Sequence, residues 1–129
     1  MVESALVSLI FFTILLGIID FGQFIYFQQT LAERARAGAR YAVLHPSLVD
    51  KIKNMAIYNN PDAPTGSVAL LPGLTTGMIT VSTDSLTASN GTVSVKISGY
   101  PINFVTPGLA GNFSAAPITV TYPNESSSW

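Results

Sequence analysis

The chain begins with a long apolar run that covers about its first fifth. Residues 5–19 read ALVSLIFFTILLGII, and the only charged residues between Met1 and Phe27 are Glu3 and Asp20. About 20 apolar residues are enough for an α-helix to cross the hydrocarbon core of a bilayer. The pattern predicts an apolar anchor over residues 1–27, or equally a helix buried within an assembly. No basic n-region or small-residue cleavage site accompanies it, so we expect a retained anchor and not a cleaved signal peptide.

The helical pattern continues without proline to Pro46 but becomes amphipathic over residues 28–45. Small and apolar side chains share one stripe: Leu31, Ala35, Gly38, Ala39 and Ala42. Polar and charged side chains share the other: Gln29, Glu33, Arg36 and Arg40. We therefore predict one helix over residues 1–45, roughly 65 Å long at 1.5 Å per residue. Its Ala/Gly stripe permits close approach of a sheet or a neighbouring helix.

Residues 46–129, here called the head, have a different pattern. Ser47 can cap a second short helix that reaches Tyr58 and ends at Asn59-Asn60-Pro61. Alternation of apolar and polar residues then predicts strands near 78–83, 92–98 and 118–122, of which the first two pair antiparallel. Such a small sheet needs a surface to cover, and the stripe of the long helix offers one. The fold class expected is α+β: a lollipop with a transmembrane-type helix, a short second helix and a small antiparallel β-sheet head.

Composition excludes several kinds of chemistry. The chain has no cysteine and one histidine, so we expect no metal site and no cofactor. Six basic residues against seven acidic ones give no attraction to phosphate backbones, and we expect no nucleic-acid partner. No phosphate-binding loop or hydrolase motif is present, so we predict that the protein is not an enzyme.

Two stretches carry a resemblance to a known family. Glu3 ahead of the apolar run and residues 17–43, GIIDFGQFIYFQQTLAERARAGARYAV, resemble the N-terminal region of TadE/TadG-like proteins of Tad (type IVc) pilus systems. Residues 93–109, VSVKISGYPINFVTPGL, are similar in style to a later part of those proteins. The resemblance implies a pilin precursor that is anchored in the inner membrane, cleaved by a prepilin peptidase and built into a pilus by an assembly machinery.

The start of the chain departs from that family pattern. Precursors of this kind carry a basic leader, and their glutamate stands at the fifth position after cleavage, whereas here it is Glu3. No Lys or Arg precedes the apolar run, so a positive-inside count alone would place the head in the cytoplasm. A pilin needs the opposite topology, and we expect that a basic leader has been removed from this sequence.

Three sets of polar side chains are candidate assembly contacts. A carboxylate in hydrocarbon is costly and marks a function or a partner. We predict that Glu3 sets subunit register by meeting the N-terminal amine of a neighbouring copy; the alternative is an interfacial position among headgroups and water. Asp20 at the end of the run either faces water, which we favour, or accepts from Gln23 or pairs with an arginine of another subunit. Glu33, Arg36 and Arg40 form either a solvated helix stripe with a Glu33–Arg36 pair or contacts between subunits.

Glycine and asparagine positions complete the candidates. Gly17 and Gly22 weaken the helix by about 1 kcal/mol each relative to alanine, and mark either local melting or close packing. Asn90, Asn112 and Asn124 match the N-glycosylation pattern, which arises readily by chance in a Ser/Thr-rich sequence.

These observations favour a structural role. The leading prediction is a pilin subunit of a type IV-like (Tad) pilus, assembled by its N-terminal helices with copies of itself or other pilins, for attachment or adhesion. It would be anchored in the inner membrane before assembly and lie in an extracellular filament afterwards. The alternatives are a minor TadE/TadG-like pilin that primes assembly and a membrane-anchored binding domain that never polymerises.

Overall fold

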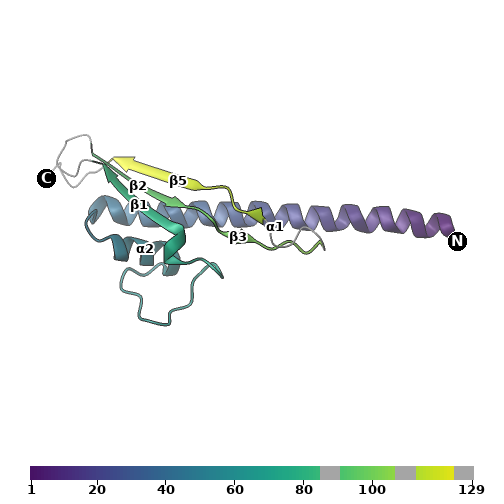
Figure 1. Cartoon of the computed structure of the whole chain (residues 1–129), viewed down its shortest axis with the longest axis horizontal. Helices are drawn as coiled ribbons and strands as arrows, with labels where there is room; N and C mark the ends of the chain where they lie inside the picture. The colour runs from purple at the N-terminus through teal and green to yellow at the C-terminus, as the bar shows by residue number, and fades with distance from the viewer. Residues whose placement is uncertain (85–90, 107–112, 124–129) are drawn as a thin grey trace.

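The computed structural model describes residues 1–84, 91–106 and 113–123. One long helix, α1 (Val2–Leu44), runs the length of the molecule, and the head covers only its C-terminal half (Figure 1). The N-terminal half projects alone. The predicted α+β lollipop, with a long apolar helix, a short second helix and a small antiparallel sheet, is confirmed.

α1 is continuous because no proline interrupts it before Pro46, and it stops there because proline disfavours helical conformation at the residue before it. His45 caps the helix through its backbone N–H, which donates to the carbonyl of Tyr41 at 3.1 Å. A turn then leads into α2 (Val49–Tyr58). Its N-cap is Leu48, with no side-chain hydrogen bond, so the predicted capping by Ser47 is wrong.

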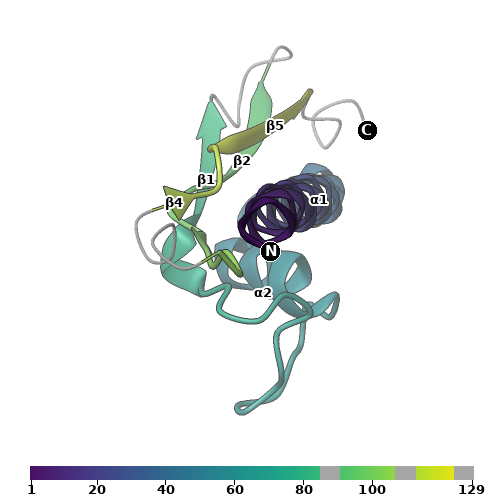
Figure 2. The ribbon, with the colours of Figure 1, turned by 90° about the vertical axis from the view of Figure 1, so that its right-hand side faces the viewer.

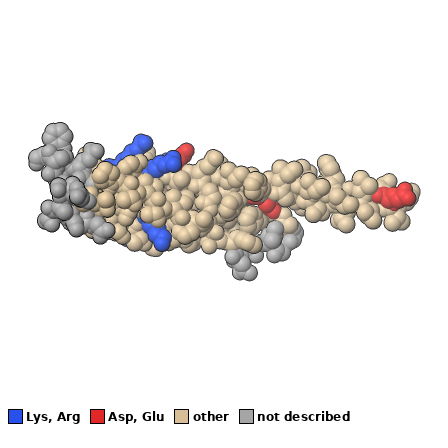
Figure 3. All heavy atoms as spheres, turned by 90° about the horizontal axis from the view of Figure 1, so that it is seen from above, with Lys and Arg blue, Asp and Glu red and all other residues tan. Residues whose placement is uncertain are grey.

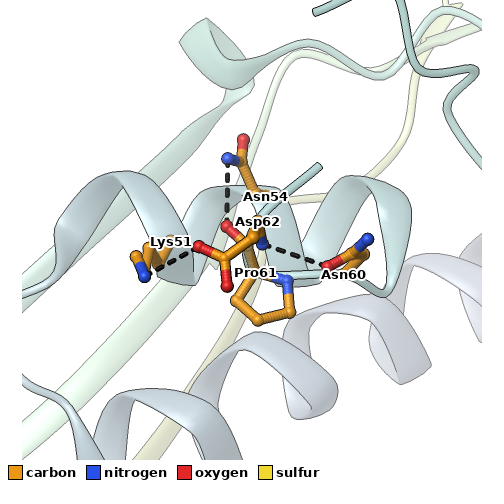
Figure 4. A network of polar contacts seen from close by, with 5 residues as sticks. All are labelled: Lys51, Asn54, Asn60, Pro61 and Asp62. Atoms are coloured by element: carbon orange, nitrogen blue, oxygen red, sulfur yellow. Dashed lines mark hydrogen bonds and ion pairs between the residues drawn. The ribbon is translucent and has the colours of Figure 1, made fainter. Parts of the chain in front are cut away.

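α2 ends as predicted at Asn59, which takes the left-handed conformation with φ 55°. The chain after it is tied back onto α2 by polar contacts (Figure 4). Lys51 Nζ pairs with Asp62 Oδ1 at 2.7 Å, and Asn54 Nδ2 donates to the carbonyl of Pro61 at 3.3 Å. The Asp62 carboxylate accepts a hydrogen bond from the Lys51 ammonium and attracts its positive charge. Both effects raise the pKa of Lys51.

The head sheet has three antiparallel strands in the order β1-β2-β5: β1 (Ile79–Asp84), β2 (Thr92–Ile97) and β5 (Ile118–Pro123). Val95 of β2 lies opposite Val81 and Val120, which places three valines in one row of the inner face. The alternate residues Thr92, Ser94 and Lys96 face outward. A short 3-10 helix, Thr76–Met78, leads into β1.

A second, two-stranded sheet lies within the segment that the sequence indicated only as an extended excursion. β3 (Pro101–Ile102) pairs antiparallel with β4 (Phe113–Ser114). The backbone N–H of Ala115 also donates to the carbonyl of Tyr100 at 2.8 Å. Strands of two residues are too short to produce a recognisable alternation of apolar and polar positions.

The core lies where α1 passes between the sheet and α2, as the end-on view shows (Figure 2). Its fully buried side chains come from all three layers. They include Leu31, Ala35, Ala39 and Ala42 of α1, Ile52 and Ala56 of α2, and Val93, Val95 and Ile97 of β2. The small-residue stripe of α1 is thus the surface that the sheet and α2 cover.

Candidate assembly surface

The apolar half of α1 is not covered by any other described part of the chain. None of residues 2–19, here called the bare segment, is buried, although they include leucines, isoleucines, valines and phenylalanines. By length and composition, α1 is a helix that could cross a membrane. Contiguous apolar surface of this extent marks a site that lipid or protein covers.

Glu3 lies in the first turn of α1 and is exposed. A carboxylate there is favourably placed, because the free N–H groups of a helix N-terminus carry partial positive charge. Val7 and Ile10, four and seven residues further on, share its face of the helix and are also exposed. Its pairing with the N-terminal amine of a neighbouring copy stays a prediction.

Asp20 is the first buried residue of α1 and, among the described residues, the single buried charged side chain, with 5% of its surface exposed. The loop after β3 encloses its carboxylate. Oδ1 accepts the backbone N–H of Val105 at 2.8 Å, and Oδ2 accepts the backbone N–H of Thr106 at 3.2 Å. The Thr106 hydroxyl donates to the same Oδ2. The carboxylate thus fastens the head to the helix where the bare segment ends.

The favoured interpretation of Asp20 as a water-facing residue is wrong for this structure. Its recorded partners are neither Gln23 nor an arginine but a loop 85 residues away in sequence. Two of the three donors belong to the backbone, and a backbone N–H leaves no signature in residue type. No pattern in the sequence therefore identifies Val105 and Thr106 as the partners of Asp20.

The predicted close-packing residues lie in the core. Ala35 and Ala39 are fully buried. Gly38 lies under α2, where an added Cβ would stand 3.2 Å from Ala56 Cβ and 3.5 Å from the Ile52 carbonyl oxygen. Gly17 and Gly22 differ, because an added Cβ at either would meet nothing within 4 Å. Of these three helix glycines, therefore, Gly38 is the one that close approach within the described structure requires.

The polar stripe of α1 faces away from the core. Glu33, Arg36 and Arg40 are exposed, and together with Arg34 and Ala37 they line a shallow hollow. Figure 3 shows blue side chains gathered over the head half of the molecule, with red at the N-terminal tip. The predicted Glu33–Arg36 ion pair does not form; in the described part of the chain the recorded pair is Lys51–Asp62.

A groove of about 590 Å³ lies at the junction of the bare segment and the head. Its lining includes Tyr26 and Phe27 of α1 together with Pro72 and Tyr100 of the head. The Tyr100 ring packs on Phe27 at 5.8 Å between centroids, and its hydroxyl donates to the carbonyl of Pro72 at 2.8 Å. Burial raises the pKa of Tyr100.

The remaining candidates can be stated briefly. Asn90, Asn112 and Asn124 lie outside the described residues. Over residues 1–84, 91–106 and 113–123, no group of three or more histidine or acidic side chains is placed to hold a metal ion.

Comparison with known proteins supports the resemblance seen in the sequence. Residues 1–40 match the family model described as TadE-like protein, which confirms the TadE/TadG-like resemblance over the apolar part of α1 and much of its amphipathic part. The match indicates a pilin-like protein associated with a Tad pilus system, and together with the apolar helix it fits membrane anchoring. No curated protein and no solved structure matches the chain.

Proposed function

We propose that this protein is a structural pilin subunit of a Tad pilus that assembles by lateral packing of its N-terminal helices. Before assembly the bare segment lies in the inner membrane, where a prepilin peptidase and the pilus assembly machinery act on the protein. After assembly it lies in an extracellular filament that serves attachment or adhesion. The role is structural, without catalysis, cofactor or nucleic acid.

One observation carries the proposal: the bare segment extends away from a head that is already complete. The head and the second half of α1 share one buried core, built from α2, the sheet and that half of the helix. Residues 2–19 add nothing to that core, yet they are almost entirely apolar. A segment of this kind costs free energy in water and gains it in a bilayer or in a bundle of like helices. The TadE-like match over residues 1–40 supports the bundle.

A minor pilin that primes assembly is the second candidate. The family match over residues 1–40 is compatible with a minor subunit as well as with a major one. A major and a minor subunit would share the same bare segment and head. Their abundance in the filament distinguishes them.

The test is electron microscopy of filaments sheared from producing cells, with mass spectrometry of their subunits. A major pilin is the bulk component of those filaments, and a minor pilin is a trace component. Absence from the filaments, with the protein abundant in membranes, would refute both and leave a membrane-anchored binding domain. Glu3→Ala supplies a second test, since it should keep the protein in the membrane but block its incorporation into filaments.

A further inference from the structure

Charges are distributed unevenly along α1. Glu3 is the single charged residue of the bare segment. Arg36 and Arg40 lie near the other end, both exposed and one helical turn apart, and are here called the arginine ridge. The ridge and Glu3 are separated by about 50 Å along the axis, at 1.5 Å per residue, so they cannot meet within one straight helix.

Within residues 1–84, 91–106 and 113–123, no acidic side chain forms an ion pair with the ridge. Glu33 lines the same hollow but forms no ion pair with either arginine, and the described residues contribute no other acid to that hollow. The ion pair recorded in the described part of the chain joins Lys51 and Asp62, and Lys51 belongs to α2. As far as the described residues go, the ridge therefore carries a net positive charge on the exposed side of α1.

The two ends of α1 match in spacing as well as in charge. Glu3, Val7 and Ile10 stand at intervals of four and three residues, which places them on one face of the helix. Arg36, Arg40 and Val43 repeat the same intervals 33 residues later. Two parallel copies shifted by 33 residues would align Glu3 with Arg36, Val7 with Arg40, and Ile10 with Val43.

The surface beside the ridge suits the apolar members of that alignment. Val43, Leu44, Tyr122 and Pro123 line a second hollow, which Arg40 also borders. Leu44 is 69% exposed, a large value for an apolar side chain beside a completed core. Val7 and Ile10 of another copy are likewise exposed and uncovered. The apolar contact of Ile10 with Val43 and the charge pair of Glu3 with Arg36 would thus form in the same register.

We propose that the arginine ridge and its flanking hollow are the docking surface for the N-terminal end of a second copy, with Glu3 of that copy lying between Arg36 and Arg40. The two copies are parallel and staggered by about 50 Å along the helix axis. The inference rests on the proposed pilin function, and it assigns the contact that fixes axial register to two arginines of the neighbouring copy in place of its N-terminal amine. A slip by one helical turn would leave the Glu3 carboxylate beside one of the two arginines instead of between both, which weakens the charge pairing.

Charge exchange tests the pairing. Glu3→Lys should lower filament yield on the order of tenfold or more, because it puts like charges together at a desolvated contact. Arg36→Glu in the same chain should restore the yield. The matched control is Glu3→Lys with Lys96→Glu, which has the same net charge but places the new acid on the outer face of β2. Equal rescue by the control, or no rescue by Arg36→Glu, would overturn the proposal.

Cross-linking supplies a second readout that does not depend on the variant charges. The chain has no native cysteine, so Ile10→Cys with Val43→Cys should form disulfide-linked oligomers when assembled filaments are oxidised. Ile10→Cys with Thr119→Cys, which places the second thiol on the outer face of β5, should stay monomeric. Filaments that contain the protein but show no Ile10–Val43 cross-link would refute the docking and leave the pilin function intact.

The alternative partner for the ridge is an anionic lipid surface. If lipid occupied it, Arg36→Glu would weaken binding of the full chain to vesicles containing phosphatidylglycerol, while filament yield and cross-linking would be unaffected. That pattern would overturn the proposal. Absence of the protein from all filaments would instead refute the pilin function itself.

Discussion

Gly38 lies where α1 packs directly against α2, and replacing it by leucine gives a quantitative test of the fold. A Cβ at this position would lie 3.2 Å from Ala56 Cβ, 3.5 Å from the Ile52 carbonyl oxygen and 3.7 Å from Val95 Cγ1. The first two belong to a Cβ and to the backbone, so neither can rotate away. Leucine brings three further carbons into the same layer, and the whole of α2 must shift to admit them.

Two opposing terms set the size of the effect. Leucine is the better helix former by roughly 0.8 kcal/mol. Overpacking of a filled core costs about 1–3 kcal/mol, and immovable neighbours place this site at the upper end. Gly38→Leu should therefore lower the free energy of unfolding by roughly 2 kcal/mol. For a chain of this size that lowers Tm by roughly 8 °C.

Gly22→Leu is the matched control, because an added Cβ there meets nothing within 4 Å. It should leave Tm unchanged or raise it slightly. The assay is thermal unfolding in detergent micelles followed by near-UV circular dichroism, which reports tertiary packing around tyrosines while the bare segment stays helical in the micelle. Equal melting temperatures for the two variants would show that α2 does not pack on Gly38.

Three further changes test other parts of the structure. Asp20→Asn should speed proteolytic cleavage at residues 103–106, because an amide presents a donor where the loop also donates; Glu33→Gln, an exposed change on α1, should not. Ile52→Ala removes a fully buried side chain and should cost about 2–5 kcal/mol of unfolding free energy in chemical denaturation, whereas Thr119→Ala on the exposed face should stay within about 0.5 kcal/mol. Tyr100 keeps its proton in the folded state at a pH where the unfolded chain has lost it, since burial raises its pKa. Its contribution to stability is thus complete below about pH 10 and falls as pH rises through the raised pKa, so Tyr100→Phe should reduce the alkaline fall in Tm.

The parts of the fold that depend on a repeating pattern could be predicted from the sequence. A helical pattern that no proline interrupts before Pro46 indicated α1, and the alternation in residues 92–98 indicated β2 within one residue of its bounds. The stripe of small residues through Ala35 and Gly38 indicated the face of α1 that is covered. Each of these signals extends over several turns or several pairs of positions, so single exceptions do not obscure it.

The contacts made by single residues over long sequence separations could not be predicted. Asp20 is bound by Val105 and Thr106, and two of the three hydrogen bonds use backbone donors. The β3–β4 pairing depends on two residues in each strand. Neither contact produces periodicity in the sequence. Both form because the segment between β2 and β5 lies over α1 when those two strands pair.

The position of Asp20 also changes the length of the segment that needs covering. Hydropathy places the end of the anchor at Phe27, but Phe24 and Phe27 pack against the core of the head. The stretch in which no residue is buried is therefore residues 2–19, about 27 Å long, which fits the roughly 30 Å hydrocarbon core of a bilayer. Phe21, Ile25 and Tyr26 continue the exposed apolar surface beyond it. The hydrogen bonds between Asp20 and the loop after β3 fix the head to α1 at that boundary. The bilayer and a bundle of neighbouring helices would therefore cover the same surface. Transfer of the bare segment from the bilayer to the bundle then breaks no contact between the head and α1. Under the proposed function, the subunit can therefore leave the membrane without unfolding.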